Sequence, residues 1–365
     1  MNKKTILFLV IISFSILTIS GCLDFININS GLTIYESHPT KVRYTIDYGY
    51  NVNCTGVGDY NIKYNCDKPE ILIGLVKIVN LFHDQDYFET TITHNDVIHW
   101  NISDDGNKNY KLGLVATIEI ESFLVSDLSG KGAETLQGLQ DNYKDIINQY
   151  CCKQLNSTIT FIDPEDSLIK TTVNNILNIT KSNNSFILAK ELFIWLKQNT
   201  NYQTHIRDNN IQPTNITIQK KTGDCDDLSF LYISLCRSID IPARFIRGYL
   251  VEENDNEISM VSHAWAEVFV GGKIGNQGWI PVECAGDSSI ETEINQNFGV
   301  EDVSHLRLFE DDGSNESMNT SISSIMMYYD DSVKVDITFF GEINDYYIID
   351  TKELYINEYG ERKYI

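Results

Sequence analysis

Gly223-Asp224-Cys225-Asp226-Asp227 stands directly before a run of apolar residues at helical spacing, and this stretch decides the fold. Leu228, Leu231 and Leu235 repeat three and four residues apart, which predicts a helix with one buried face. Cys225 lies three residues before Leu228, so it belongs to the inward face of the first turn. Gly223 permits a tight turn into the helix. The pattern therefore places a thiol at the N-terminus of a buried helix.

The first turn of a helix is a favourable place for a reactive thiolate. Unpaired N–H groups and the helix dipole there stabilise an anion and lower the pKa of a thiol. Asp226 and Asp227 act in the opposite sense, because neighbouring negative charges raise that pKa. We therefore expect a cation beside the sulfur of Cys225, and a histidinium is the usual one.

A predicted hairpin supplies the histidine and a carboxylate. Residues 261–270 alternate as a strand, with His263 on one face, and residues 279–283 read as the return strand after a glycine-rich turn. A hairpin centred on Lys273 sets Glu283 directly opposite His263. A slip of one residue would turn Glu283 to the other face, so the interpretation depends on the register. A carboxylate there would orient the imidazole and stabilise its charged form.

Five blocks of sequence, taken together, resemble the core of the transglutaminase-like superfamily. In chain order they are Trp195 with Asn199-Thr200-Asn201-Tyr202, then Gly223-Asp224-Cys225, Ile241-Pro242-Ala243-Arg244-Phe245-Ile246-Arg247-Gly248-Tyr249, His263-Ala264-Trp265-Ala266-Glu267-Val268 and Gly278-Trp279-Ile280-Pro281-Val282-Glu283. The resemblance covers about residues 165–290 and implies an α+β, papain-like core with Cys225 as nucleophile and His263 as base. Glu283 falls where most members carry Asp, so the resemblance implies that Glu283 is the acid that orients His263 in a Cys-His-acid triad. The flanking regions are similar to archaeal transglutaminase-like membrane proteins.

The N-terminus resembles an export signal. Lys3 and Lys4 precede an apolar run, Ile6 to Ile19, and the run ends at Ser20-Gly21-Cys22. The small residues before Cys22 are typical of a lipoprotein box, in which that cysteine is lipidated. The alternative is an uncleaved anchor helix, since apolar residues continue past Cys22 towards the ~20 needed to cross a bilayer. Both alternatives tether the chain to the cell membrane with its bulk outside the cytoplasm.

The remaining sequence divides around the predicted core. We expect a signal or anchor segment, a β-sandwich-like domain, a helical connector, the catalytic core, and an acidic linker with a small C-terminal β module. The boundaries are 1–26, 27–130, 131–164, 165–290 and 291–365.

Composition and spacing exclude several classes of partner. A net charge of −23 without a basic stripe argues against nucleic-acid binding. Cys-x-x-Cys and His-x-x-x-His spacings are absent from the sequence, so we expect no metal and no cofactor. Cys54 and Cys66 flank turn residues and are candidates for a disulfide, among pairings that the sequence leaves open.

The expected activity is that of a cysteine peptidase or amidase. Cys225 would attack an amide or isopeptide bond of a cell-envelope peptide or protein and form a thioester. Water is plentiful outside the cytoplasm, so we expect hydrolysis rather than crosslinking. The alternative is a non-catalytic peptide-binding or structural envelope protein on the same fold, since Glu283 and the acidic neighbours of Cys225 depart from a clean catalytic pattern.

Overall fold

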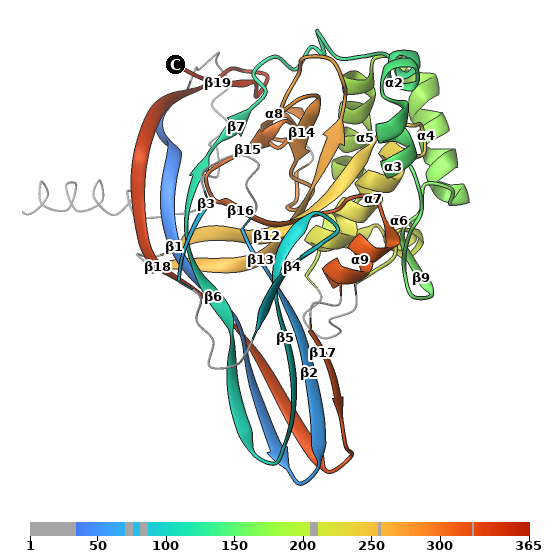
Figure 1. The fold of residues 1–365 in the computed structure, drawn as a ribbon. Coiled ribbons are helices and arrows are strands. Elements are labelled where there is room, and N and C mark those ends of the chain that lie inside the picture. The colour runs from blue at the N-terminus through green and yellow to red at the C-terminus, as the bar shows by residue number, and fades with distance from the viewer. Residues whose placement is uncertain are drawn as a thin grey trace, which may run out of the picture.

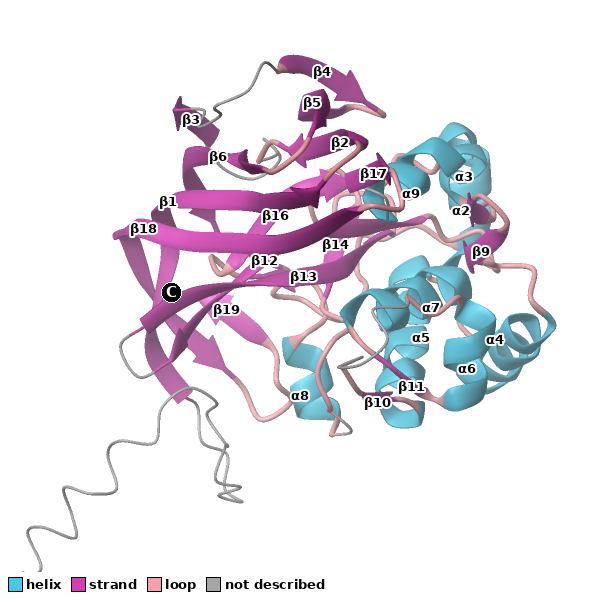
Figure 2. Cartoon of the chain, turned by 90° about the horizontal axis from the view of Figure 1, so that it is seen from below, coloured by secondary structure: helices cyan, strands magenta, loops and turns pink. Residues whose placement is uncertain are grey.

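The computed structural model describes residues 34–69, 76–80, 87–204, 211–254, 257–288, 290–322 and 325–365. Two parts are recognisable in it (Figure 1): a set of long β-strands, and a mixed α/β core. Figure 2 shows helices α4, α5, α6 and α7 gathered on one side and the long strands on the other. Residues 1–26, with the predicted lipidation site Cys22, lie outside the described residues.

The core is built around helix α7 (Cys225–Arg237), which follows the helical pattern of its apolar residues. Leu228, Leu231 and Leu235 are at most 1% exposed, so the predicted inward face is buried. Helices α4 (Ser167–Thr180), α5 (Ser185–Asn199) and α6 (Thr214–Lys220) pack against α7 on the side away from the sheet.

A four-stranded antiparallel sheet covers the other side of α7. Its strand order is β14-β13-β12-β16. The strands are β12 (Ala243–Asn254), β13 (Glu257–Phe269), β14 (Trp279–Val282) and β16 (His305–Glu310). Helix α7 packs directly on β13 and β12, so the N-terminus of the helix lies against the strand that carries His263.

Two further sheets share a second hydrophobic core. One has the order β19-β18-β1-β6-β3 and the other β17-β2-β5-β4. Their strands are β1 (Ile34–Gly56), β2 (Asp59–Asp67), β3 (Val76–Asn80), β4 (Phe88–Ile92), β5 (Asn95–Asp105), β6 (Lys108–Glu121), β17 (Ile325–Tyr329), β18 (Val333–Ile356) and β19 (Arg362–Tyr364).

The strands from the end of the chain belong to these same two sheets. β18 pairs antiparallel with β1 from Ile34↔Ile356 to Gly56↔Val333, and β17 pairs with β2. The sequence had suggested a separate C-terminal module. Its strands instead complete sheets that the N-terminal strands begin: β6 pairs with one side of β1, and β18 pairs with the side that β6 leaves open.

Short elements complete the structure. They are β7 (Phe123–Leu124), α2 (Leu136–Asn142), α3 (Lys144–Tyr150), β8 (Gln154–Asn156), β9 (Ile159–Ile162), β10 (Asn201–Tyr202), β11 (Thr222–Gly223), α8 (Glu291–Gln296), β15 (Val300–Glu301) and α9 (Asn315–Ile322).

The predicted α+β class is confirmed, and the position of the domain boundaries stays a prediction. Within the described ranges, no helix has the length and apolar character needed to cross a bilayer. Cys54 and Cys66 are both buried free thiols here, so the candidate disulfide is not formed.

Candidate active site

A capped turn holds Cys225 as the first residue of α7. Asp224 is the N-cap, and its backbone N–H donates to the Asp227 carboxylate at 3.3 Å. Asp227 also accepts hydrogen bonds from the backbone N–H and side-chain amide of Gln212, at 2.6 and 2.7 Å. A Cβ atom on Gly223 would lie 2.6 Å from the Cβ of Asp227, so the turn requires glycine there. The predicted position of Cys225 at the helix N-terminus is confirmed.

The surroundings of the sulfur favour the neutral thiol. Burial raises the pKa of Cys225, and the charges of Asp226 and Asp224 raise it further, whereas a hydrogen bond from the backbone N–H of Ala264 acts to lower it. Asp227, which the sequence suggested as a contributor, is engaged in the turn instead. Burial and a hydrogen bond with Asp224 also raise the pKa of Asp226, so this pair retains a proton more readily. A base is therefore needed to take the thiol proton during reaction.

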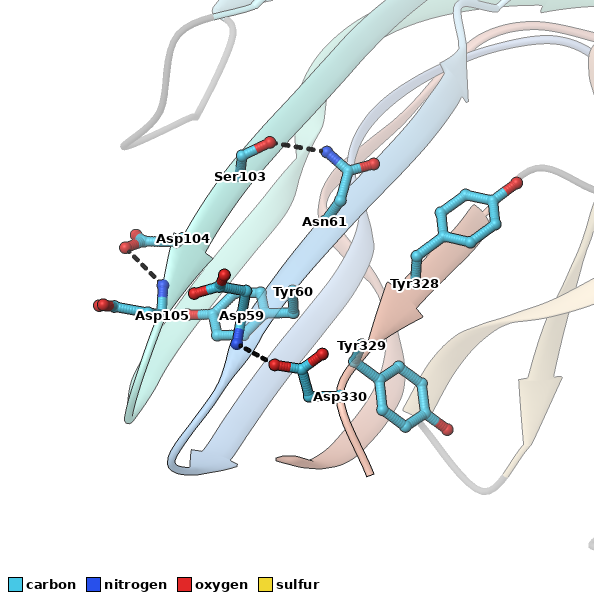
Figure 3. A pocket seen from close by; sticks show the side chains of 9 residues that line it. All are labelled: Asp59, Tyr60, Asn61, Ser103, Asp104, Asp105, Tyr328, Tyr329 and Asp330. Atoms are coloured by element: carbon cyan, nitrogen blue, oxygen red, sulfur yellow. Dashed lines mark hydrogen bonds between the residues drawn. The ribbon is translucent and has the colours of Figure 1, made fainter. Parts of the chain in front are cut away.

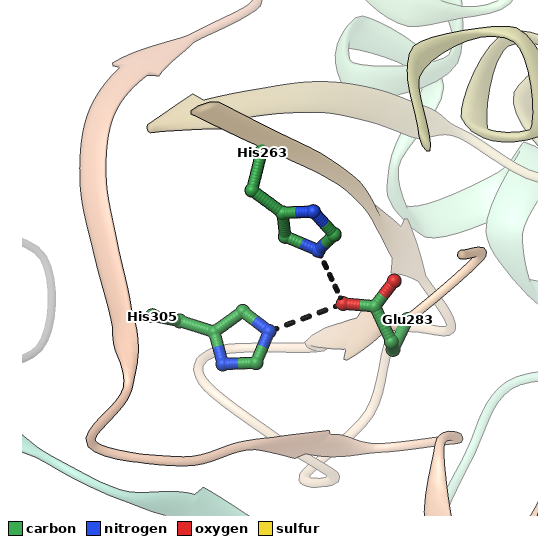
Figure 4. A group of neighbouring side chains, drawn as sticks. All are labelled: His263, Glu283 and His305. Carbon is green, nitrogen blue, oxygen red and sulfur yellow. Dashed lines mark hydrogen bonds and ion pairs between the residues drawn. The ribbon is translucent and has the colours of Figure 1, made fainter. Parts of the chain in front are cut away.

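His263 lies on β13 next to Ala264, the residue whose N–H reaches the sulfur. Its side chain is 9% exposed, and its Nε2 atom lies 2.8 Å from Oε2 of Glu283 (Figure 4). A carboxylate accepts hydrogen bonds, so Nε2 carries the proton and Nδ1 remains to accept one. The separation between Nδ1 and the sulfur of Cys225, expected from the sequence to be within about 4 Å, stays a prediction.

The register of the hairpin differs from the predicted one. β13 pairs with β14 from Phe269↔Trp279 to Ala266↔Val282. If this register is extended by one residue, the position opposite Glu283 is that of Trp265. The prediction that Glu283 lies directly opposite His263 is wrong by two residues. An even shift leaves Glu283 on the same face, and the carboxylate reaches the imidazole diagonally from just beyond the strand.

Glu283 accepts hydrogen bonds from more than one partner. Its Oε2 atom lies 3.1 Å from Nε2 of His305, and its Oε1 accepts the backbone N–H of Ala285 at 2.7 Å. Burial alone would raise the pKa of Glu283, but His263 and then His305 lower it well below its ordinary value. The carboxylate is therefore charged and shared between two imidazoles (Figure 4).

The sequence did not indicate His305, the first residue of β16, as a site residue. Its Nδ1 atom lies 2.9 Å from Oδ1 of Asp302. Burial would lower the pKa of His305, but Asp302 and then Glu283 raise it to about 10. A single histidine without a spacing motif gives no local signal, and only the fold brings it beside Glu283.

Two imidazoles and a carboxylate are also a set that can hold a transition metal. The ligand atoms of His263, Glu283 and His305 lie within 4.8 Å of one another. These residues come from distant parts of the sequence, so short spacing motifs do not reveal them. The hydrogen bonds already described account for their convergence.

Lys197 and Tyr202 support the site from the end of α5 and from β10. The Nζ atom of Lys197 donates to the carbonyl oxygens of Cys284, Ala285 and Gly286, the residues that follow Glu283. Tyr202 belongs to a short parallel pair with β11, and burial raises its pKa to about 12. The sequence assigned neither residue a role.

A wide cavity lies away from this chemistry. It has a volume of about 800 Å³ and is formed at the tips of β2, β5 and β17 (Figure 3). Its lining is acidic and aromatic, and the site residues are not among it. Several of its polar groups bind each other, as Asp330 does by accepting the backbone N–H of Asp59 at 2.9 Å. The candidate active site is therefore placed by its chemistry and not by this cavity.

A thiol at a helix N-terminus, facing a strand whose histidine is bound to a carboxylate, is the arrangement of papain-like thiol enzymes. Residues 172–284 match the family model of the transglutaminase-like superfamily, and this range contains all five sequence blocks. The chain thus contains a transglutaminase-like superfamily domain, which confirms the resemblance. The likeness to archaeal membrane proteins stays a prediction.

A solved structure shares the fold. The chain resembles a candidate cysteine protease from Cytophaga hutchinsonii with a TM-score of 0.56 and 14% identity, over 86% of this chain and 93% of that one. The periplasmic domain of TgpA from Pseudomonas aeruginosa gives a TM-score of 0.31 and 12% identity, over 70% of this chain and 93% of that domain. The comparison with curated proteins gives no match.

Proposed function

We propose that this protein is a membrane-tethered, extracytoplasmic cysteine peptidase or amidase that cleaves amide or isopeptide bonds. The observation that carries the proposal is the His263–Glu283 hydrogen bond of 2.8 Å, on the strand that also binds the sulfur of Cys225 through Ala264. Glu283 holds the proton on Nε2, which leaves Nδ1 of His263 as the base for the thiol.

The proposed reaction proceeds through a thioester. His263 takes the thiol proton while Sγ of Cys225 attacks the carbonyl carbon, and the carbonyl π electrons move to the oxygen. When the intermediate collapses, the C–N bond breaks and the imidazolium gives its proton to the departing amine. Water, deprotonated by the same imidazole, then attacks the thioester and releases a carboxylic acid and the free thiol.

The substrate and the location rest on the sequence. The proposed substrates are cell-envelope peptides or proteins, because the apolar segment ending at Cys22 would hold the core at the outer face of the membrane. Water outside the membrane competes strongly with amines for the thioester, which favours hydrolysis over crosslinking.

One observation favours the non-catalytic alternative, a peptide-binding protein. Burial and two aspartates raise the pKa of Cys225, which lowers the fraction of reactive thiolate. The histidine decides between the alternatives, because a thiol without a functional base would react slowly.

The test is covalent labelling of the full chain by a thiol-reactive amide mimic, with the labelled peptide identified by mass spectrometry. The proposed enzyme is labelled at Cys225, and labelling slows at least ~100-fold in His263→Ala. Cys152→Ala removes another partly buried thiol and serves as the matched control, with labelling of Cys225 unchanged. Labelling that does not depend on His263 would support the binding protein. A screen of envelope peptides, with Cys225→Ala as the inactive control, then identifies the substrate and shows whether the product is an acid or a new amide.

A further inference from the structure

We infer that His305 is a positioning residue, which holds the long side chain of Glu283 so that its carboxylate meets His263. The inference rests on the proposed function, and its test below separates the two.

Glu283 lies just beyond the strand, where its backbone N–H donates to the carbonyl oxygen of Asn297 at 2.9 Å but no strand pair holds its side chain. β14 ends at Val282, and the last registered pair is Ala266↔Val282. A glutamate has one more rotatable bond than an aspartate, so its carboxylate samples more positions unless contacts hold it. Side-chain contacts beyond the strand ladder must therefore hold the carboxylate.

Three donors fix the two oxygens of this carboxylate. Oε1 accepts the backbone N–H of Ala285 at 2.7 Å, and Oε2 accepts from Nε2 of His263 at 2.8 Å and from Nε2 of His305 at 3.1 Å. Among these donors, His305 comes from a different strand, β16, on the far side of β12. It thus holds the carboxylate from a direction that the hairpin itself does not offer.

His305 is itself locked in orientation. Nδ1 lies 2.9 Å from the Asp302 carboxylate, which also accepts the backbone N–H of Ser304 at 3.0 Å. An ionised carboxylate only accepts hydrogen bonds, so both nitrogens of His305 donate and the ring is an imidazolium. His38 of β1 and Arg362 of β19 interact electrostatically with Asp302. His305 is therefore a fixed cation, whereas His263 keeps Nδ1 available for the proton of the thiol.

Trp265 packs against both imidazoles, whose rings also lie 5.8 Å from each other, edge to face. Its ring lies 5.8 Å from that of His263 in a stacked arrangement, and 5.0 Å from that of His305 at an angle of 80°. The indole N–H is bound to Glu301 at 2.9 Å, which fixes the ring. Each imidazole thus has one edge on Glu283 and a neighbouring aromatic surface that limits its rotation.

The first test measures the rate at which Cys225 is alkylated in the full chain at pH 7, in buffer with a chelator. His305→Ala removes the donor and should slow alkylation ~10- to 100-fold, because displacement of a catalytic group by about an ångström costs up to ~100-fold. His305→Gln keeps an N–H donor near the position of Nε2 and should recover the rate to within ~5-fold of the wild type. With a peptide substrate, kcat should fall while KM stays within ~2-fold, because His305 touches no substrate.

The matched control is His99→Ala. His99 is a partly buried histidine of β5 whose Nδ1 atom lies 2.5 Å from the side chain of Asn65, and β5 belongs to a different sheet from the site strands. This variant should react like the wild type. Thermal unfolding of each variant confirms that the folded protein is being compared.

The second test is a double-mutant cycle. Because His305 acts through Glu283, the Glu283→Ala/His305→Ala protein should react as fast as Glu283→Ala alone, to within ~2-fold. A further ~10-fold loss in the double variant would overturn the inference, as would a His305→Ala protein that reacts at the wild-type rate.

A spectroscopic measurement separates this inference from the proposed function. In a ¹⁵N-labelled chain, the Nε2–H proton of His263 should give a downfield resonance that persists in His305→Gln and disappears in His305→Ala. A resonance that is unchanged in His305→Ala contradicts the positioning role, whatever the activity. If the resonance behaves as expected but Cys225 reacts independently of His263, the proposed enzyme fails and the positioning of Glu283 stands.

Discussion

Arg307 stands at the centre of a buried ionic chain behind the site, and its removal offers a quantitative test. Its Nε donates to Glu301 at 2.6 Å, and its Nη2 donates to both Glu301 and Glu267. Arg244 binds the other oxygen of Glu267 and also Glu310. The side chains of Arg307, Glu267 and Glu301 are 5%, 4% and 6% exposed, so water cannot replace a lost partner. The perturbation is Arg307→Met, which keeps much of the volume and removes the charge.

The pKa of Glu267 indicates how much stability Arg307→Met should lose. Burial would raise this pKa, but Arg307 first and then Arg244 lower it to about 2 from an ordinary value of 4.5. That net shift, in which burial opposes the two guanidinium groups, corresponds to ~3 kcal/mol in favour of the charged carboxylate. Removing one partner of a buried ion pair costs about 3–5 kcal/mol. We therefore expect Arg307→Met to lower the free energy of unfolding by ~3 kcal/mol at pH 7.

The pH dependence has a definite sign. Because the folded-state pKa of Glu267 is depressed, its stabilisation is present above pH ~4.5 and is lost as the pH falls through about 2. In Arg307→Met, burial is opposed only by Arg244, so the pKa of Glu267 rises and this stabilisation is smaller. The difference between wild type and variant should therefore be largest at pH 7 and shrink between pH 4.5 and 2.

The assay is urea unfolding followed by tryptophan fluorescence, at pH 7 and at pH 3. Arg43→Met is the matched control, because the Arg43 side chain is 50% exposed and pairs with Glu119 at the surface. Surface pairs contribute about 0–1 kcal/mol, so the control should unfold near the wild type. A loss of stability in Arg307→Met no larger than in Arg43→Met, or an effect that is the same at both pH values, would contradict the stabilising role of Arg307.

Three further changes test the site itself. Glu283→Gln should lower the alkylation rate of Cys225 by ~100- to 10,000-fold, because an amide cannot accept hydrogen bonds from both the imidazoles and the Ala285 N–H. The rate of Glu283→Asp should lie between those of the wild type and Glu283→Gln. A rate for Glu283→Gln within ~5-fold of the wild type would contradict the role of Glu283. In His263→Ala, burial and the charges of Asp226 and Asp224 still raise the pKa of Cys225 above its ordinary value of 9.0, so the alkylation rate should keep rising beyond pH 9. A rate that reaches a plateau below pH 9 would show that the pKa of Cys225 is not raised. Lys197→Met removes the hydrogen-bond donor of three carbonyl groups and should lower the free energy of unfolding, measured by urea unfolding, by about 2–4 kcal/mol. A loss below ~1 kcal/mol would show that water replaces the ammonium group.

The parts of the site that follow from local spacing could be predicted from the sequence. Leu228, Leu231 and Leu235 define the inward face of α7, so the place of Cys225 at its N-terminus follows from counting residues. The alternation along residues 261–270 likewise puts His263 on a strand that pairs with the segment before Glu283.

The hairpin register depended on turn geometry that glycine content does not determine. The glycines of the loop fit several turns, and an additional bridge between Asn276 and Trp279 moves the centre of the hairpin from Lys273 to Ile274. Each one-residue move of the hairpin centre shifts the pairing by two residues. The predicted face of Glu283 is therefore correct although its predicted partner is not.

Contacts between distant segments left no local signal. His305 follows a short turn at the start of β16 and resembles any surface histidine until β12 brings β16 beside the hairpin. The pairing of β1 with β18 is equally hidden, since alternation identifies a strand but not its partner.

The β1–β18 pair has a consequence for the order in which the chain can fold. Synthesis delivers residues 34–56 first, yet their hydrogen-bonding partners, residues 333–356, emerge only after the whole transglutaminase-like domain. The domain between them has its own hydrophobic core and can form earlier, whereas β1 must wait with one side open. Pairing across so long a stretch of sequence is slow. The last strands thus act as the closing step of biogenesis, and a chain truncated after α9 would expose the open sides of β1 and β2 to other proteins.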